Sequence, residues 1–201
     1  MKKKIEHLPI RLICILIVAI AFILIPVPAA DLFVRIYFDE IAGDNCALYY
    51  ATDTANAISQ DQCIISEIDY EKKLVTFRLD GSFAGHLTSL RLDLPSEMEQ
   101  LACIKTITVS SAGIIQKEFN PCVFFEKANI AAANDAEITL VHPRNRAYIS
   151  AESGDPYLVL STPLVNQIQN CSSHYVLSRI FVCLFVGACC IFAKRKVFTK
   201  Q

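Results

Sequence analysis

Apolar and polar residues alternate with a period of two along most of the middle of the chain. The segment Leu74–Leu79 shows this clearly, with apolar Val75 and Phe77 on one face. The intervening Thr76 and Arg78 fall on the other face. Such alternation is typical of β-strands with one buried face. The predicted strands are Leu32–Phe38, Cys46–Tyr50, Cys63–Ile68, Leu74–Leu79, Leu90–Leu94, Ile104–Val109, Ile114–Phe119, Ile138–Val141, Ala147–Ser150 and Tyr157–Leu160.

Turn-forming residues separate these segments. Asp80-Gly81, Asn120-Pro121 and His142-Pro143 each stand between two predicted strands, and such pairs favour turns. The alanine-rich stretch Glu126–Ala136 predicts one or two helical turns. Many short antiparallel strands with few helices predict an all-β fold, an antiparallel β-sandwich of the jelly-roll type.

The same alternation predicts which side chains form the core of this sandwich. A strand with one buried face directs every second residue inward. The predicted core residues are Val75, Phe77, Leu79, Leu90, Leu92 and Leu94, and the polar residues between them, Arg78, Arg91 and Asp93, are expected to face outward or to pair across strands.

Two apolar runs flank the β-rich region. No charged residue occurs in the 19 positions from Leu12 to Ala30, and Tyr175–Ala193 is apolar apart from Ser178 and Arg179. At about 1.5 Å per helical residue, each run is long enough to cross a hydrocarbon core of about 30 Å. We therefore expect a basic tip and transmembrane helix over 1–30, an outer domain over 31–174, a second transmembrane helix over 175–193 and a cytoplasmic tail over 194–201.

The charges predict the orientation of the chain. Residues 31–174 hold 10 Lys and Arg against 19 Asp and Glu, a net charge of −9, whereas the remaining residues hold 9 against 1, a net charge of +8. Basic residues are enriched in cytoplasmic flanks of membrane helices. Both termini are therefore expected in the cytoplasm and the central domain outside the cell membrane. The acidic domain also argues against a nucleic-acid partner, because it would repel phosphates.

The first apolar run has a second interpretation as a cleavable signal peptide. It combines a basic start, an apolar stretch and small residues near a candidate cleavage site, with Val27 and Ala29 at the positions that such a site requires. Retention and cleavage both remain open. Either one places the central domain outside the cytoplasm.

Five cysteines lie in the central domain, and none of them forms a CxxC pair. A zinc ribbon or a thioredoxin-like site is therefore disfavoured. An outward location permits disulfides, but an odd number cannot all pair within one chain. The pairing of these residues stays open: Cys46, Cys63, Cys103, Cys122 and Cys171.

No catalytic or nucleotide-binding motif occurs in the chain. Adjacent acids such as Asp39-Glu40 are expected in solvated loops. Alternation would bury one of Tyr49 and Tyr50 and expose the other, although packing in the core is favoured for each. The sequence therefore favours a protein that is not an enzyme and that holds no cofactor or metal ion.

Four segments resemble a β-sandwich module of bacterial surface-polysaccharide proteins, including glycosyltransferase-linked ones. They are Leu48-Tyr49-Tyr50, Val75–Leu79, Leu90–Asp93 and Ile104–Val109. The module is similar to carbohydrate-binding jelly rolls. The resemblance implies an accessory protein of surface-polysaccharide assembly, with a surface glycan or a polytopic membrane protein as partner beside the lipid bilayer. Two alternatives stay open, a divergent extracytoplasmic glycan hydrolase or transferase and a scaffold for other membrane proteins.

Polar loops around the tyrosine strand are the candidate ligand contacts. Asp44 and Asn45 precede this strand, and Asp53 and Asn56 follow it. They are expected at opposite ends of the strand, so that neighbouring loops would have to complete a site at either end.

Overall fold

The computed structural model describes residues 30–54, 58–95, 102–111, 114–151 and 154–173, within a compact unit that spans Ala29–Ser173. Its strands are β1 (Leu32–Glu40), β2 (Asn45–Thr52), β3 (Cys63–Glu67), β4 (Leu74–Leu79), β5 (Leu87–Asp93), β6 (Ala102–Ser111), β7 (Ile114–Phe119), β8 (Ile130–Asn134), β9 (Ala136–Val141), β10 (Arg146–Ala151) and β11 (Tyr157–Leu160). Its helices are α2 (Gly81–Ala84), α3 (Pro121–Phe124) and α4 (Thr162–Ser173), with 3-10 turns at Lys127–Asn129 and His142–Arg144.

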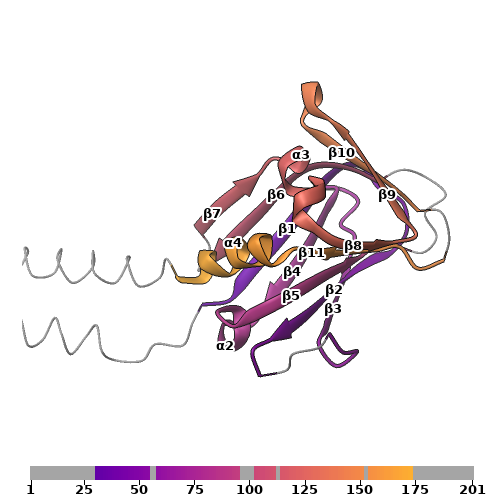
Figure 1. Ribbon diagram of the computed structural model, residues 1–201. Coiled ribbons are helices and arrows are strands. Elements are labelled where there is room, and N and C mark those ends of the chain that lie inside the picture. Colours follow the sequence, from indigo (N-terminus) through magenta and orange to yellow (C-terminus); the bar gives the residue numbers. More distant parts are fainter. Residues whose placement is uncertain (1–29, 55–57, 96–101, 112–113, 152–153, 174–201) are drawn as a thin grey trace, which may run out of the picture. The chain divides into compact units, whose positions relative to one another are not determined.

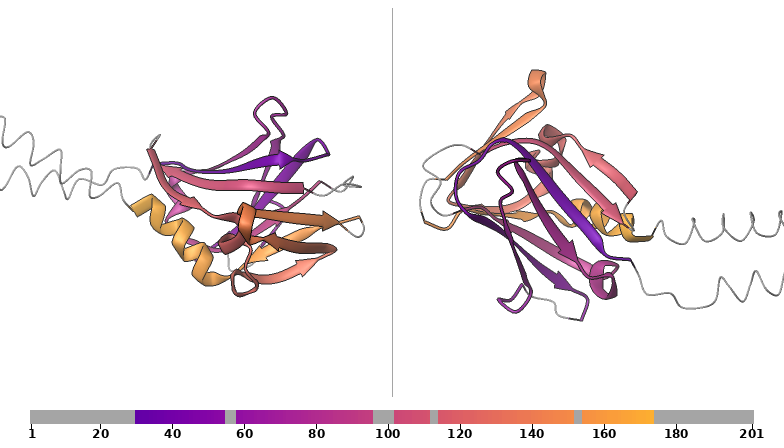
Figure 2. Two further views of the ribbon diagram at one scale, coloured as in Figure 1. Left: turned by 90° about the horizontal axis from the view of Figure 1, so that it is seen from above. Right: turned by 180° about the vertical axis from the view of Figure 1, so that it is seen from behind.

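The strands form two antiparallel sheets that face each other (Figures 1 and 2). One sheet, which we call sheet A, has the order β4-β1-β6-β10-β9, and β7 pairs with the remaining length of β6. The other, sheet B, has the order β3-β2-β5-β11-β8. All strand pairs are antiparallel among the described residues, which confirms the predicted all-β antiparallel fold.

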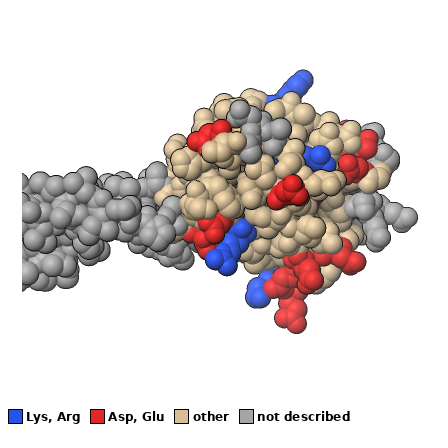
Figure 3. Space-filling view, turned by 90° about the horizontal axis from the view of Figure 1, so that it is seen from below, with Lys and Arg blue, Asp and Glu red and all other residues tan. Residues whose placement is uncertain are grey.

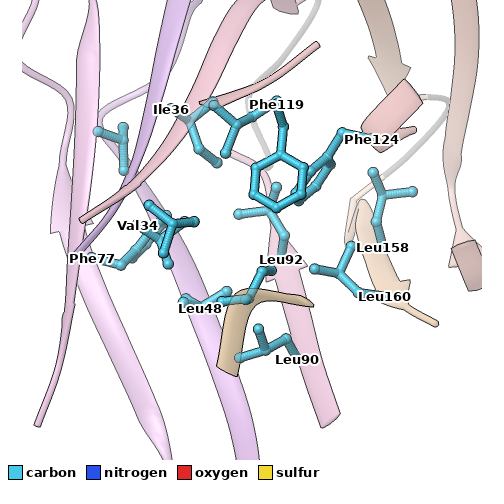
Figure 4. Packing of buried hydrophobic residues seen from close by; sticks show 14 of the residues in the cluster. Val34, Ile36, Leu48, Phe77, Leu90, Leu92, Phe119, Phe124, Leu158 and Leu160 are labelled. Carbon is cyan, nitrogen blue, oxygen red and sulfur yellow. The ribbon is translucent and has the colours of Figure 1, made fainter. Parts of the chain in front are cut away.

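The core lies between the two sheets (Figure 4). Several strands bury alternate residues, as β1 does with Val34 and Ile36. Phe77 of β4 lies opposite Val34 in sheet A and is fully buried. The predicted inward residues are all confirmed as members of this core: Val75, Phe77, Leu79, Leu90, Leu92 and Leu94.

Two short helices occupy positions where only turns were predicted. Asp80 caps α2, since its side chain accepts a hydrogen bond from the Ser82 backbone N–H. Asn120 caps α3 in the same way through the Cys122 N–H, and Pro121 occupies the first turn. Asp and Asn are favoured at this position because they satisfy backbone donors that the helix leaves free.

Two elements differ from the sequence prediction. The stretch Glu126–Ala136 contains one 3-10 turn, but most of it forms the edge strand β8. Helix α4 was not predicted. Its buried residues contact β5 and β6, one strand from each sheet, so that α4 closes one end of the core (Figure 1). These buried residues are Leu164, Val165, Ile168 and Cys171.

Both ends of the domain meet at α2. The Asp31 carboxylate, just before β1, accepts a hydrogen bond of 3.1 Å from the Gly81 backbone N–H. Near the end of α4, the Gln169 side-chain amide donates to the Gly85 carbonyl. The chain therefore enters and leaves the sandwich at the same end.

Among the described residues, no helix is both long and apolar enough to cross a lipid bilayer. The two predicted spanning segments, 12–30 and 175–193, lie outside these residues apart from Ala30.

The five cysteines of the described domain are free thiols. Four of them are buried, and Cys63 is half-buried. Burial raises the pKa of the Cys46 thiol to about 12 and also raises the pKa of Cys171. These buried thiols are protonated at neutral pH and pack as small apolar side chains.

Candidate functional site

A cluster of polar and aromatic side chains lies on the outward face of sheet B. Arg91 lies in the middle strand β5, directly opposite Tyr49 of β2. Their neighbours Leu48 and Leu92 point into the core, so Tyr49 and Arg91 point outward. The cluster, which we call the arginine–tyrosine cluster, consists of Tyr49, Arg91, Asp93, Asp155 and Tyr157.

The Arg91 guanidinium is held by aromatic and acidic side chains at once. Its central carbon lies 3.7 Å from the ring centroid of Tyr157 and 5.1 Å from that of Tyr49. Its Nε and Nη2 each donate a hydrogen bond of 2.6 Å to one oxygen of Asp93. Nη2 also lies 3.7 Å from the Asp155 carboxylate. Planar stacking and a two-bond fork are the contacts that guanidinium makes best.

Arg91 and Asp93, the two charged side chains that form this fork, are buried to different extents. The side chain of Asp93 is 13% exposed and that of Arg91 is 24% exposed. Burial raises the pKa of the Asp93 carboxyl, and repulsion by the Asp155 carboxylate raises it further. The hydrogen bonds and the charge of Arg91 lower this pKa, but they do not outweigh the effect of burial. The fork with Asp93 raises the pKa of Arg91, although burial opposes this. Since arginine stays charged at ordinary pH, only the carboxyl titrates in this pair.

This carboxyl should make the stability of the domain pH-dependent. The folded state binds the Asp93 proton more tightly than the unfolded chain, whose pKa is close to the ordinary 3.8. Stability therefore falls as the pH rises from the ordinary pKa through the raised pKa of the folded state. We expect wild type to lose stability relative to Asp93→Asn over this interval, as measured by urea unfolding at a series of pH values. A difference that grows in the opposite direction would contradict the assignment.

Apolar side chains border the cluster on both sides. Ile65 of β3 is 69% exposed. It lies beside Ala47 of β2, which in turn lies opposite Asp93. On the far side, the exposed Ala132 of β8 lies opposite Val159 of β11. The cluster is thus bordered by apolar side chains, and the fork keeps a limited exposure, 24% for Arg91 and 13% for Asp93.

Of the four candidate ligand residues, Asn45 lies closest along sheet B to this cluster. It shares the outward face with Ala47 and Tyr49, because Cys46 and Leu48 point inward. Asp44 precedes it and is also exposed.

Asp53 lies at the other end of β2. Its carboxylate is 3.0 Å from Nδ1 of His86. Strand residues advance by about 3.3 Å each, so β2 separates Asp53 from Asn45 by more than 20 Å. The fourth residue, Asn56, lies outside the described residues. The three that are described therefore do not form one site, as expected from their positions around the strand.

The adjacent tyrosines Tyr49 and Tyr50 have different roles. Tyr50 packs against the core and its ring stacks on Phe83, with centroids 4.7 Å apart and planes 7° from parallel. Tyr49 lies outside the core and contacts Arg91. The alternation therefore correctly predicted one inward and one outward tyrosine, whereas the expectation of core packing is wrong for Tyr49. The polar-face positions of Arg91 and Asp93, together with one outward tyrosine, are the sequence signal that could have located the cluster.

A second polar cluster lies on sheet A. Arg146 donates to the Asp39 carboxylate, and the Cys103 thiol lies 4.0 Å from the same carboxylate. Tyr148 hydrogen-bonds Cys103. Burial raises the pKa of Cys103, so its thiol is protonated and a poor nucleophile. This cluster joins β1, β6 and β10 rather than offering a reactive group.

Within the described part of the chain, no group of three or more His, Cys, Asp or Glu side chains is placed to hold a metal ion. Comparisons of the chain with protein-family models, curated proteins and solved structures found no significant match.

Proposed function

We propose that this protein is a membrane-anchored, non-enzymatic accessory protein of cell-surface polysaccharide assembly. In this proposal its jelly-roll-like sandwich lies outside the cytoplasm and contacts glycan through the outward face of sheet B. The arginine–tyrosine cluster is the observation that carries the proposal. It gathers two half-exposed aromatic rings and a fork of hydrogen-bonding groups on one sheet face.

The chemistry of the cluster suits a sugar ring. A pyranose offers an apolar C–H face and hydroxyl groups around its edge. Tyr49 and Tyr157 can contact the apolar face, since aromatic rings combine a large apolar surface with little conformational freedom to lose. The Asp93 carboxylate has lone pairs beyond the two that Arg91 occupies, and these can accept hydrogen bonds from hydroxyl groups. Small neighbours such as Ala47 leave room for a polymer chain to lie across the sheet.

The chain ends support anchoring at one side of the domain. Asp31 and Gln169, close to the two ends of the sandwich, both bond to residues of the α2 region. Two membrane segments could therefore follow from the same end of the domain.

Loss of the Tyr157 ring should weaken glycan binding. In calorimetric titrations of the full-length protein in detergent against the host's surface polysaccharides, Tyr157→Ala should reduce affinity about two- to thirteenfold, as expected for about 0.5–1.5 kcal/mol of aromatic contact. Tyr37→Ala is the matched control, because Tyr37 is a half-buried tyrosine of β1 in sheet A. If wild type, Tyr157→Ala and Tyr37→Ala bind glycan with equal affinity, the sheet B face is not the contact surface. Absence of glycan binding in wild type would favour the scaffold function.

Reporter fusions test the proposed topology. Fusions after Lys4 and after Lys200 should report a cytoplasmic location, and an insertion at Asp80 should report an extracytoplasmic one. Asp80 is exposed at the start of α2, so an insertion there is accessible. A cytoplasmic signal at Asp80 would overturn the proposal. N-terminal sequencing that begins at Ala30 would show that the first apolar run is cleaved.

A further inference from the structure

We infer that the arginine–tyrosine cluster selects uncharged glycans and rejects polyanionic ones. This inference rests on the proposed function and names the class of polymer that the same face would bind. It follows from how Arg91 is held and from the charge around it.

Arg91 is the one cation of the cluster, and its anion-binding edge is already occupied. Anionic groups such as carboxylate and phosphate are recognised best by two parallel N–H donors of one guanidinium. In Arg91 these donors, Nε and Nη2, both bond to Asp93 at 2.6 Å. The aromatic ring of Tyr157, 3.7 Å away, covers one of its faces. An anionic sugar would have to displace a half-buried carboxylate to gain the same contact.

The local charge also disfavours an anion. Arg91 contributes one positive charge, and Asp93 and Asp155 contribute two negative charges, so the cluster has a net charge of −1. The wider domain, residues 31–174, carries a net −9, from 10 basic and 19 acidic residues. On the face seen in Figure 3, acidic side chains cover more of the surface than the basic ones that lie beside them. A polymer with a negative charge on every repeat would therefore be repelled by the cluster and by the net negative charge of the domain.

An uncharged sugar meets neither obstacle. Its hydroxyl groups can donate to the remaining lone pairs of Asp93 and Asp155 without separating the fork. The fork holds the Asp93 carboxylate fixed, so that little ordering is needed when a sugar binds. Its apolar face can rest on the tyrosine rings and on the exposed Ile65.

Paired polymers test this selectivity. The full-length protein in detergent is titrated with neutral dextran, mannan and galactan and with dextran sulfate and polygalacturonate, each at 20 mM and 500 mM NaCl. We expect saturable binding of at least one neutral polymer, with an affinity that changes less than about twofold between the two salt concentrations, because no charge is neutralised on binding. We expect no binding of either polyanion.

A substitution of Arg91, which forms the fork with Asp93, gives a second test of the inference. Arg91→Lys keeps the charge but cannot form two parallel bonds to Asp93, and it should weaken neutral-polymer binding about tenfold. Arg78→Lys is the matched control, since Arg78 is an exposed arginine of β4 that pairs with Asp31, and it should bind as wild type does. Salt-sensitive binding of a polyanion in place of a neutral polymer would overturn this inference and leave glycan contact standing. No binding of any polymer in the set would overturn both.

Discussion

Replacing Phe77 with alanine should lower the free energy of unfolding of the 29–173 domain by about 3–5 kcal/mol, the range for a buried aromatic residue. Phe77 is 0% exposed and lies between the two sheets (Figure 4). Its removal would leave a cavity that the surrounding strands cannot fill without losing their register. Because a domain is stable by only about 5–15 kcal/mol in total, the variant should melt well below wild type in thermal unfolding followed by circular dichroism.

Ile65→Ala provides the control for this change. Ile65 is also an apolar strand residue, but it is 69% exposed, and its truncation leaves no cavity. Its unfolding free energy should stay within about 0.5 kcal/mol of wild type. If Phe77→Ala melts as Ile65→Ala does, Phe77 is not a core residue and the register of β4 is wrong.

Replacing Gly43 with alanine should cost about 2–5 kcal/mol of stability. Gly43 has φ +96°, a conformation that strains a residue with a side chain by about 1–2 kcal/mol. A Cβ atom there would lie 2.2 Å from Cβ of Pro95. Relief of this overlap should add about 1–3 kcal/mol. Urea unfolding of the domain measures the sum.

Gly154→Ala separates this effect from the general effect of losing a glycine. No atom lies within 4 Å of the Cβ position at Gly154, so alanine should be accommodated there with little change in stability. If Gly43→Ala is as stable as Gly154→Ala, the turn between β1 and β2 does not pack against Pro95.

Most of the strands could be predicted because each buries one face. The bounds predicted for Leu74–Leu79, Ile114–Phe119 and Tyr157–Leu160 agree with β4, β7 and β11. In each of these segments, neighbouring turn residues end the alternation at the strand end. Most other strands extend one or a few residues beyond the prediction, since backbone pairing continues after the apolar pattern has stopped. The predicted ends at Ile68 and Leu94, by contrast, lie one residue beyond the ends of β3 and β5.

The elements that were missed owe their structure to tertiary contacts. β8 reads Ile-Ala-Ala-Ala-Asn, which favours a helix locally, but pairing with β11 makes it a strand. α4 begins at Thr162-Pro163, and its apolar residues are interrupted by amides such as Asn166 and Gln167. Its helical form depends on burial over the end of the core, which the local pattern did not reveal.

The candidate site was only partly predictable. Alternation placed Arg91 and Asp93 on an outward face, and this is confirmed, but it did not show that the two pair along the same strand. The order of strands in sheet B brings Tyr157 beside Arg91, although 66 positions separate them in sequence. Long-range neighbours of this kind depend on topology, which spacing along the chain does not determine.

The meeting of both chain ends at α2 has a mechanical consequence. A force that drew the sheet B face away from these ends would pull β1 along its own axis. β1 pairs with β4 on one side and with β6 on the other over most of its nine residues. Since these hydrogen bonds run across the strand direction, they would be sheared together rather than broken one by one. The first strand of the domain would therefore resist traction through its pairing with both neighbours, in addition to its buried side chains.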